Sequence, residues 1–444
     1  MNSRLGELLP SIKTVPPGPR SLELAGRLRT VESRNITSFR RDFPIFWDQA
    51  AGSNILDVDG NIYVDLTSAF GVALAGHSHP SIRRAMEEQG RHLVHGMGDV
   101  HPSEPKVALM EELASLSPWK ETRTVLASSG AEAIEIALKT AQLFTGKAGL
   151  IAFRGAYHGL TLGSLSVTDR KDFRGPFVDR LADKTNFVSF PRNEEESIKV
   201  VIQIEDILRD KEASIAPIGA IVIEPIQGRG GVRMAPKGFL ENLSKVCKEA
   251  GVVLVFDEIF TGMGRSGVVF ETEAAGVVPD LVCLGKALGG GMPLSACLGS
   301  RPVMEAWPET QGEAIHTSTF LGHPLSCAAG LAFLDVLKSE DLVTKSLEKG
   351  KYLMNSIQET LEPGQHNYQI RGRGLLVGIE FHTETGDPLK GMGGHVSRLA
   401  LREGLLVLPA GRYGEVVELV PPATITEEQI DFTVKGFSKI LLGG

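Results

Sequence analysis

Cysteine is scarce in this chain of 444 residues. There are four cysteines and no CxxC spacing among them, which excludes a disulfide-framed secreted domain and the common cysteine-rich zinc sites. Free thiols in a reducing compartment are the better interpretation of Cys247, Cys283, Cys297 and Cys327.

The chain also lacks the features that mark membrane, secreted and nucleic-acid-binding proteins. No apolar run approaches the ~20 residues that a transmembrane helix needs. The first twenty residues contain no apolar stretch followed by a small-residue cleavage site. The formal net charge is −8 and there is no long basic block, so nucleic-acid and anionic-membrane partners are disfavoured. We therefore expect a cytoplasmic protein.

Short apolar runs rich in β-branched residues recur through the middle of the chain. They do not alternate strictly between polar and apolar residues, which is typical of strands that are buried on both faces. A helical pattern, residues 131–144, follows the first of them. An α/β fold with a mostly parallel sheet is therefore predicted, with strands at residues 122–128, 149–153, 218–226, 252–259 and 280–285.

The two ends of the chain have different patterns. The first ~40 residues carry prolines and basic residues and are interpreted as an arm. Residues 54–66 read as two strands around an Asp59-Gly60 turn. Towards the C-terminus, helices are predicted near 342–361 and 425–441 and strands near 375–381 and 405–408.

Polar residues at the predicted strand ends are candidates for a site, because ligands of open α/β sheets bind outside the carboxyl ends of the strands. The first such stretch is SSGAEA, residues 128–133. Free N–H groups at the helix start, with the hydroxyls of Ser128 and Ser129, would hold a phosphate. A plain capping box of Ser129 and Glu132 explains the same residues.

Asp257, Glu224 and Lys286 end or follow other apolar strands. A buried carboxylate such as Asp257 needs a cationic partner, which is either a protein side chain or the ring nitrogen of a cofactor. Glu224 is either a strand-end salt-bridge partner or a carboxylate near a reacting centre. Lys286, in LVCLGKALGGG, is either a helix-start lysine or an amine made nucleophilic by desolvation. With Tyr157 as an aromatic candidate, the set suits pyridoxal phosphate.

Two other motifs point elsewhere but fit less well. GMGRSG, residues 262–267, matches the dinucleotide-binding GxGxxG, yet no amphipathic helix opens at its glycines. His92, His95 and His101 are close in sequence, but their spacing matches no metal motif. We expect no metal site.

Over residues ~35 to the end, the sequence resembles the class III aminotransferases, of the fold type I group of pyridoxal-phosphate enzymes. The motifs that carry this resemblance occur in the family's order: DVDGNIYVDLTSAFGVALAGHSHP, SSGAEAIE, AYHG, IEPIQG, FDEIFTGMGRSG, PDLVCLGKALGGGMPLSA, STFLGHPLSCAAG and RGRGLLVGIEF. The resemblance implies a large cofactor-binding α/β domain, residues 86–335, and a smaller α+β domain made by the chain ends, 1–85 with the arm and 336–444.

The resemblance also implies residue roles. Lys286 would form a Schiff base with the cofactor and shuttle a proton, and Asp257 would pair with the ring nitrogen. Glu224 would lie near the ring and the substrate. The other cofactor-binding residues would be Ser129, Gly130 and Ala131 at the phosphate, Tyr157, His158 and Ile259 at the ring, and Thr319 at the phosphate of the neighbouring subunit of a homodimer.

Three positions depart from the family's pattern. Phe260 stands where many members have a glutamine near the cofactor's 3′ oxygen. Leu160 and Glu418 stand where members specific for amino acids often have arginines. The usual partner of a substrate carboxylate is therefore missing, which favours an amine substrate or another binding orientation.

The sequence therefore predicts an aminotransferase that moves an amino group from an amine or amino acid to a keto acid or aldehyde. An isomerase of the same family is the alternative, either a racemase or epimerase or an aminomutase, because it would use the same Lys286, Asp257 and phosphate site.

Overall fold

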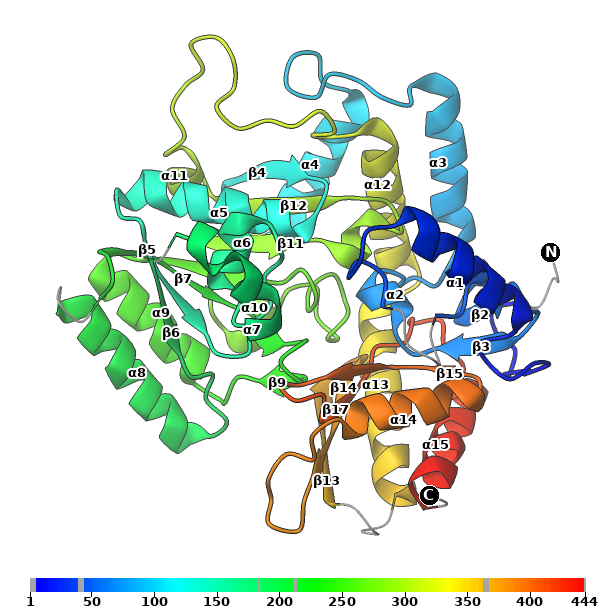
Figure 1. Ribbon diagram of the computed structural model, residues 1–444. Helices are drawn as coiled ribbons and strands as arrows, with labels where there is room; N and C mark the ends of the chain where they lie inside the picture. The colour runs from blue at the N-terminus through cyan, green and yellow to red at the C-terminus, as the bar shows by residue number, and fades with distance from the viewer. Residues whose placement is uncertain (1–4, 39–43, 183, 211–213, 362–366, 443–444) are drawn as a thin grey trace. The chain divides into compact units, whose positions relative to one another are not determined.

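The computed structural model describes residues 5–38, 44–182, 184–210, 214–361 and 367–442. The chain forms two compact units, and Figure 1 shows their elements. The first unit combines the two ends of the chain, Met1–His79 and Lys345–Gly444, and the second is the continuous segment Pro80–Thr344.

The second unit is built on a seven-stranded sheet with the order β4-β12-β11-β10-β7-β5-β6. Neighbouring strands are parallel except at β12, which runs antiparallel to both β11 and β4. The prediction of a mostly parallel sheet is confirmed. The strands are β4 (Thr122–Ala127), β5 (Gly149–Phe153), β6 (Thr185–Val188), β7 (Ile218–Ile223), β10 (Val253–Asp257), β11 (Leu281–Leu284) and β12 (Ser295–Ser300).

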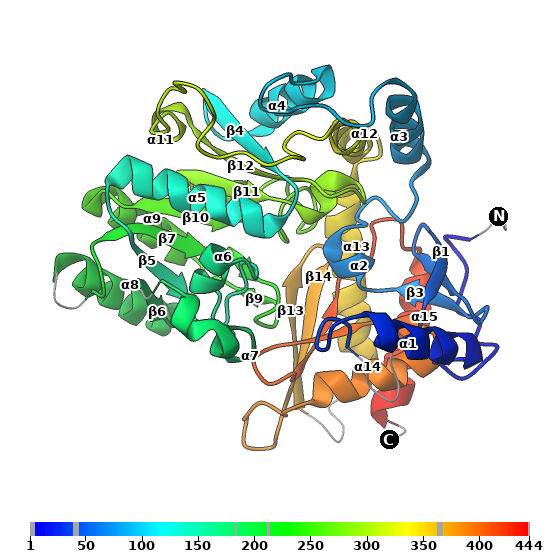
Figure 2. The same cartoon turned by 45° about the horizontal axis from the view of Figure 1, so that its top comes forward.

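Helices on both faces explain why the central strands do not alternate. Every residue of β7, β10 and β11 is buried. Figure 2 shows α5 on one face of this sheet and α8 and α9 on the other. Alternate strand residues such as Val253 and Val255 pack with Ile134 and Ala137 of α5. The main helices of this unit are α3 (Pro80–His92), α4 (Glu104–Leu116), α5 (Gly130–Thr145), α8 (Glu194–Arg209), α9 (Phe239–Ala250) and α12 (Pro324–Ser339).

Shorter elements complete the second unit. Most of them lie in the connections that follow the strands, where the candidate residues were expected. They are α6 (Leu162–Val167), α7 (Lys171–Arg174), α10 (Glu271–Ala275), α11 (Arg301–Met304), the two-stranded β8 (Ile226–Gln227) and β9 (Arg233–Met234), and the 3-10 turns η1 (Gly175–Arg180) and η2 (Lys286–Gly289).

The first unit contains two four-stranded sheets with the orders β1-β2-β3-β15 and β13-β14-β17-β16. The predicted turn at Asp59-Gly60 joins the antiparallel β2 and β3, and Gly60 has the positive φ of 83° that the turn requires. The strands are β1 (Trp47–Ala51), β2 (Asn54–Asp57), β3 (Ile62–Asp65), β13 (Asn367–Arg373), β14 (Leu376–His382), β15 (Leu405–Leu406), β16 (Leu408–Ala410) and β17 (Val416–Leu419).

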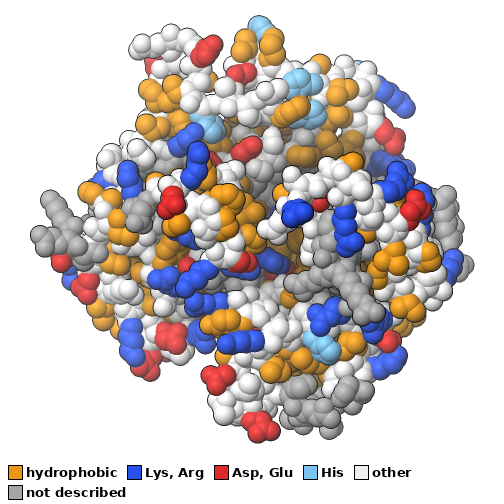
Figure 3. All heavy atoms as spheres, viewed as in Figure 1, with side chains coloured by type: hydrophobic (Ala, Val, Ile, Leu, Met, Phe, Trp, Pro, Cys, Tyr) orange, Lys and Arg blue, Asp and Glu red, His pale blue; other side chains and the backbone are white. Residues whose placement is uncertain are grey.

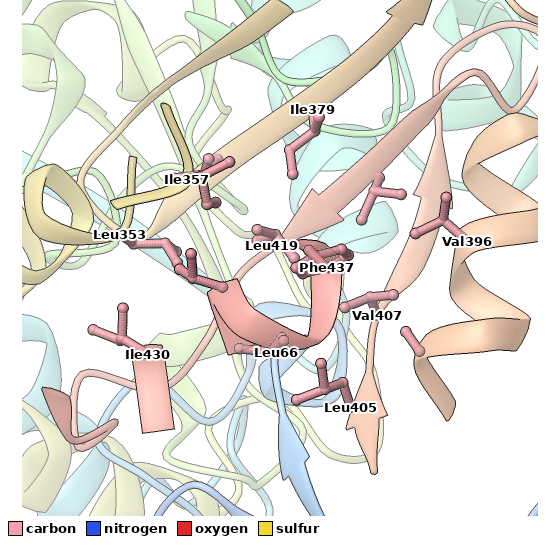
Figure 4. Packing of buried hydrophobic residues seen from close by; sticks show 14 of the residues in the cluster. Leu66, Leu353, Ile357, Ile379, Val396, Leu405, Val407, Leu419, Ile430 and Phe437 are labelled. Atoms are coloured by element: carbon pink, nitrogen blue, oxygen red, sulfur yellow. The ribbon is translucent and has the colours of Figure 1, made fainter. Parts of the chain in front are cut away.

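One apolar core joins the two chain ends of the first unit (Figure 4). Leu66 from the N-terminal end packs with Leu353, Leu405 and Phe437 from the C-terminal end, and all four are buried. The predicted arm contains a helix, α1. The helices are α1 (Pro19–Val31), α2 (Ser68–Gly71), α13 (Leu342–Thr360), which starts in the second unit, α14 (Met392–Arg402) and α15 (Glu427–Leu442).

Charged side chains of both signs are interspersed on the face seen in Figure 3. None of the described helices combines the length and the apolarity that a membrane crossing requires.

Candidate active site

The candidate residues of the second unit follow strands that lie in one sheet. Asp257 is the last residue of β10, and Lys286 follows Gly285, the first residue after the end of β11 at Leu284. Ser129 follows β4 and caps α5, and Glu224 comes directly after β7. Because β4, β7, β10 and β11 run in the same direction, these side chains lie at the carboxyl-terminal edge of the sheet.

A buried ion pair joins Asp257 to His158. Asp257 is 4% exposed, and its Oδ2 lies 2.7 Å from Nδ1 of the fully buried His158. Burial opposes protonation of the imidazole, but the hydrogen bond and the charge of Asp257 outweigh it and raise the pKa of His158 above 6.5. The other carboxylate oxygen of Asp257 accepts the N–H of Ile259 at 3.0 Å. Both oxygens of Asp257 therefore have a partner inside the protein.

Glu224 is a third buried ionisable group beside this pair. It is 6% exposed, and its two oxygens accept the N–H groups of Tyr157 at 3.1 Å and Gly228 at 3.3 Å. Burial raises the pKa of Glu224 to about 7, the charge of His158 opposes this rise, and that of Asp257 adds to it. Glu224 therefore fixes two loops and titrates near neutrality.

The start of α5 combines a hydroxyl cap with free backbone donors. Ser129 Oγ accepts the N–H of Glu132 at 3.3 Å, while the Glu132 carboxylate accepts the N–H of Ser128 at 2.7 Å. In a standard capping box the glutamate would accept the N–H of the cap residue, Ser129. Here it accepts the N–H of Ser128, the residue before the cap. Ser295 Oγ of β12 donates to the Ser129 carbonyl at 2.6 Å and so holds the cap residue in place.

Small residues bring the start of α5 close to two neighbouring loops. A Cβ on Gly130 would lie 2.9 Å from Ile259 Cδ1, and a Cβ on Gly159 would lie 2.7 Å from that of Ala131. Gly159 also has a φ of 128°, which side chains rarely adopt. The segments after β4, β5 and β10 therefore converge at the N-terminus of α5, where an anion is stabilised by the helix dipole.

Lys286 has a strained backbone and an aromatic neighbour. Its φ is 44°, in the left-handed region that favours glycine. Its Nζ lies over the ring of Phe260, 4.4 Å from the ring centroid. Phe260, which stands where many family members have a glutamine, therefore places the face of its ring against the Lys286 amine.

Tyr157 lies half-buried among aromatic and basic side chains. Its ring meets that of Phe173 edge-on, with centroids 5.9 Å apart. Burial raises the pKa of the Tyr157 phenol, while the positive charges of Arg229 and Arg170 lower it. Two guanidinium groups thus act electrostatically on this side chain.

Thr319 is not joined to the other candidate residues by any hydrogen bond of the described chain. It is exposed on the turn before α12. Among the positions that depart from the family's pattern, Leu160 is 49% exposed, and Glu418 is buried in β17 of the first unit.

Several supporting residues gave no signal in the sequence. Thr168 accepts the N–H of His158 at 2.9 Å, and Glu135 accepts those of Gly163 at 2.8 Å and Ser164 at 3.3 Å. Like Ser295, they hold backbone groups next to the candidate residues, and no local pattern marks them. Nothing in the described part of the chain gathers three or more potential metal ligands.

Comparison with known proteins identifies the family. The profile of class III aminotransferases matches residues 37–441. An acetylornithine aminotransferase of Methanosarcina acetivorans is 34% identical over 391 residues, 88% of this chain and 90% of the relative. An alanine/serine racemase of Pyrococcus horikoshii is 32% identical over 432 residues, 94% and 90% of the two chains.

The fold agrees with these relatives. An amine transaminase from an uncultivated Pseudomonas species, solved in its PLP-bound form, aligns with a TM-score of 0.83 and 27% identity over 91% of this chain and 97% of that one. The chain belongs to the class III aminotransferases, fold type I enzymes that depend on pyridoxal phosphate.

Proposed function

We propose that this enzyme transfers an amino group from an amine or amino acid to a keto acid or an aldehyde, using Lys286, Asp257 and the N-terminus of α5. The single observation that carries the proposal is the buried pair of Asp257 and His158 at the end of β10, with Lys286 after the adjacent parallel strand β11. This arrangement places a buried carboxylate and an amine after the ends of two neighbouring parallel strands.

The residues present fit pyridoxal phosphate. Ser129, Gly130 and Ala131 would hold its phosphate, because the start of α5 offers N–H donors and a favourable dipole. Tyr157 and Ile259 would hold the ring between them. When bound, the cofactor supplies an electron sink for the electrons of the bond that is broken at the substrate carbon.

Asp257 and His158 would act on the ring nitrogen through charge. Asp257 raises the pKa of the buried His158, and its carboxylate would likewise stabilise a proton on the facing ring nitrogen. The buried Nε2 of His158 has no hydrogen-bond partner among the described residues, which fits a position next to a further bound group.

Lys286 would bind the cofactor covalently through Nζ and, once released, take a proton from the substrate carbon at the same atom. A general base contributes when it alternates between two protonation states near the working pH. Glu224 would place Tyr157 and the turn that starts at Gly228 through its two backbone hydrogen bonds.

Glu224 gives a pH dependence to the stability of the protein. Its pKa rises from 4.5 to about 7 on folding, so its contribution is complete below pH 4.5 and is lost as the pH rises through 7. The difference of 2.5 units corresponds to about 3 kcal/mol of unfolding free energy. Denaturant unfolding between pH 4.5 and 8 should show a shallower decline for Glu224→Gln than for the wild type, and parallel curves would contradict this assignment.

An isomerase is the second candidate function. The racemase of Pyrococcus horikoshii, 32% identical over 94% of this chain, favours it. Isomerisation would use the same Lys286 and Asp257. In a racemase or epimerase the proton would return to the same carbon from the opposite face, and in an aminomutase the amino group would move within one molecule. The candidate residues therefore do not separate the two reactions, and only the fate of the substrate does.

The deciding experiment follows the visible absorbance of the cofactor-loaded enzyme during titration with a panel of amines and amino acids, with chiral chromatography of the same samples. An aminotransferase is expected to lose the absorbance band with one donor class and regain it when a keto acid is added. A band that persists while one enantiomer becomes a mixture would instead establish a racemase.

We also propose a homodimer in which Thr319 reaches the phosphate of the neighbouring subunit. Exposed apolar residues gather near it: Met97 is 55% exposed, Val100 63%, Ile315 67% and Phe320 56%. The ring of His95, 5.2 Å from that of Phe320, shows that these two segments lie side by side. Sedimentation of a monomer at micromolar concentration would contradict the dimer.

We further propose two properties. The first is a cofactor-binding domain at 86–335, flanked by the segments 1–85 and 336–444 of a smaller domain. The second is a cytoplasmic location. The four free, buried cysteines support the location. Fractionation of the producing cells tests it.

A further inference from the structure

An aromatic ring lies directly against the amine of Lys286. Nζ is 4.4 Å from the centroid of the Phe260 ring, within the ~6 Å over which a ring face attracts a cation. Phe260 stands on the turn after β10, and Lys286 follows the parallel neighbour β11. The pairing of the two strands therefore brings ring and amine together.

The position of the ring is fixed by a glycine on another loop. A Cβ on Gly228 would lie 2.2 Å from Cδ1 and 2.5 Å from Cε1 of Phe260, so only glycine leaves room for the ring. The N–H of Gly228 is in turn held by Glu224 at 3.3 Å. The ring is thus packed against a turn that a buried carboxylate anchors.

The backbone of Lys286 is fixed as well. A φ of 44° costs energy for a residue with a side chain and persists only where the surroundings impose it. The preceding Gly285 approaches Ile259 closely, since a Cβ there would lie 3.2 Å from Ile259 Cγ2. The direction in which the Lys286 side chain leaves the chain is therefore set by the fold.

A ring face distinguishes the two forms of an amine. It attracts an ammonium ion through its quadrupole and has little attraction for the neutral amine. Unlike a carboxylate, a phenyl ring takes no proton and forms no conventional hydrogen bond. Such a neighbour holds the charged form in place without competing for its proton.

We propose that Phe260 is a positioning residue for Lys286, whose ring face holds the ammonium form of Nζ and so sets the pH at which this amine loses its proton. The inference rests on the proposed function, in which Lys286 alternates between its two forms. It assigns a role to a side chain that cannot make the polar contact of the glutamine often found at this position.

The other titratable groups at this edge of the sheet are Asp257 at the end of β10, His158 and Tyr157 after β5, and Glu224 after β7. A substitution confined to Phe260 leaves all four in place, so a change in the titration of Lys286 between variants is attributable to the ring.

The test compares Phe260→Leu, which removes the ring face, with Phe260→Tyr, which keeps it. Phe260→Met serves as a second apolar replacement in case the leucine variant does not fold. The matched control is Phe187→Leu on β6, which removes another ring with cations over its face. The guanidinium carbons of Arg154 and Arg174 lie 5.6 Å and 5.0 Å from the centroid of the Phe187 ring.

The measurement is the acylation of Lys286 by an amine reagent as a function of pH, in the cofactor-free full-length chain, by peptide mass spectrometry. Lys106, whose Nζ donates to the Gly98 carbonyl, is the internal reference. We expect the midpoint for Lys286 to fall by about 0.5–1.5 pH units in Phe260→Leu or Phe260→Met and to stay unchanged in Phe260→Tyr and Phe187→Leu.

Equal midpoints for the wild type, Phe260→Leu and Phe260→Met would overturn the proposal, as would an equal shift in the tyrosine variant. The labelling does not depend on turnover. A shifted midpoint in a protein whose loaded form fails to respond to any amine or amino acid would therefore uphold the role of Phe260 and refute the proposed function. With an active enzyme, a shift of the pH–rate profile of Phe260→Leu to lower pH provides the second readout.

Discussion

Replacement of Lys286 by alanine is expected to lower turnover by at least about 10³-fold while leaving the fold intact. The loss has two parts, because the same Nζ would bind the cofactor and move the proton. Stability should change little. The side chain is only partly buried, and alanine meets the same left-handed backbone with φ of 44° as lysine does.

A matched substitution separates charge from reactivity. Lys286→Arg keeps a positive charge near Phe260, but a guanidinium does not give up its proton at accessible pH and is a poor nucleophile. We expect it to be as inactive as the alanine variant. Small primary amines added to Lys286→Ala should restore part of the proton transfer, since they supply the missing base in solution.

The measurements are the rates of single half-reactions with the best donor, together with circular dichroism and sedimentation to establish that the variant is folded. Turnover of Lys286→Ala within tenfold of the wild type would exclude Lys286 as the reactive amine. Inactivity accompanied by unfolding would show that this residue is needed for the structure instead.

The buried strands were predictable because their pattern is local. The runs at 218–226 and 252–259 contain the buried strands Ile218–Ile223 and Val253–Asp257, and burial on both faces leaves an uninterrupted apolar signal. The strand Ser295–Ser300, SACLGS, was missed because its small residues have weak strand preference. It is a strand because β11 and β4 pair with it on either side.

The residues of the candidate site also differ in whether a local sequence pattern reveals them. Asp257 and Lys286 stand out because a charged residue ends an apolar run. The partner of Asp257 does not stand out, since His158 lies 99 residues earlier in the chain, and it was named only through the family resemblance. Ser295 and Ser129 are 166 residues apart in the chain, and the sequence around neither residue indicates their contact. Contacts made by tertiary folding need the fold before they become visible.

Asp257→Asn is expected to lower turnover by about 10²–10³-fold, the usual loss when one preorganised electrostatic group is removed. Asparagine keeps the shape of the side chain but carries no charge. It would no longer stabilise a proton on the facing ring nitrogen, and it would no longer raise the pKa of His158.

The effect on stability should be smaller and has its own cause. Asp257 accepts from Ile259 with one oxygen and faces His158 with the other, whereas asparagine has one oxygen and one NH₂ group. One of these buried contacts must then be lost or reversed, which costs about 1–3 kcal/mol. Chemical denaturation measures this part separately from turnover.

Asp280→Asn is the matched control, because Asp280 lies at the opposite edge of the same sheet. It directly precedes β11, and its Oδ2 accepts the N–H of Leu254 at 2.8 Å. We expect this variant to keep its turnover, because asparagine can still accept the N–H of Leu254 and the change lies away from the candidate site.

The histidine provides the readout that distinguishes a role in charge stabilisation from a merely structural one. In the wild type, the imidazole of His158 should remain protonated above pH 6.5, and in Asp257→Asn it should be neutral at that pH, as NMR of labelled histidine would show. If turnover falls while His158 stays protonated, Asp257 does not act through this pair. If His158 loses its proton and turnover is unchanged, the charge at the end of β10 is not part of the reaction. Only the joint loss supports the proposed mechanism, because both effects arise from the same carboxylate.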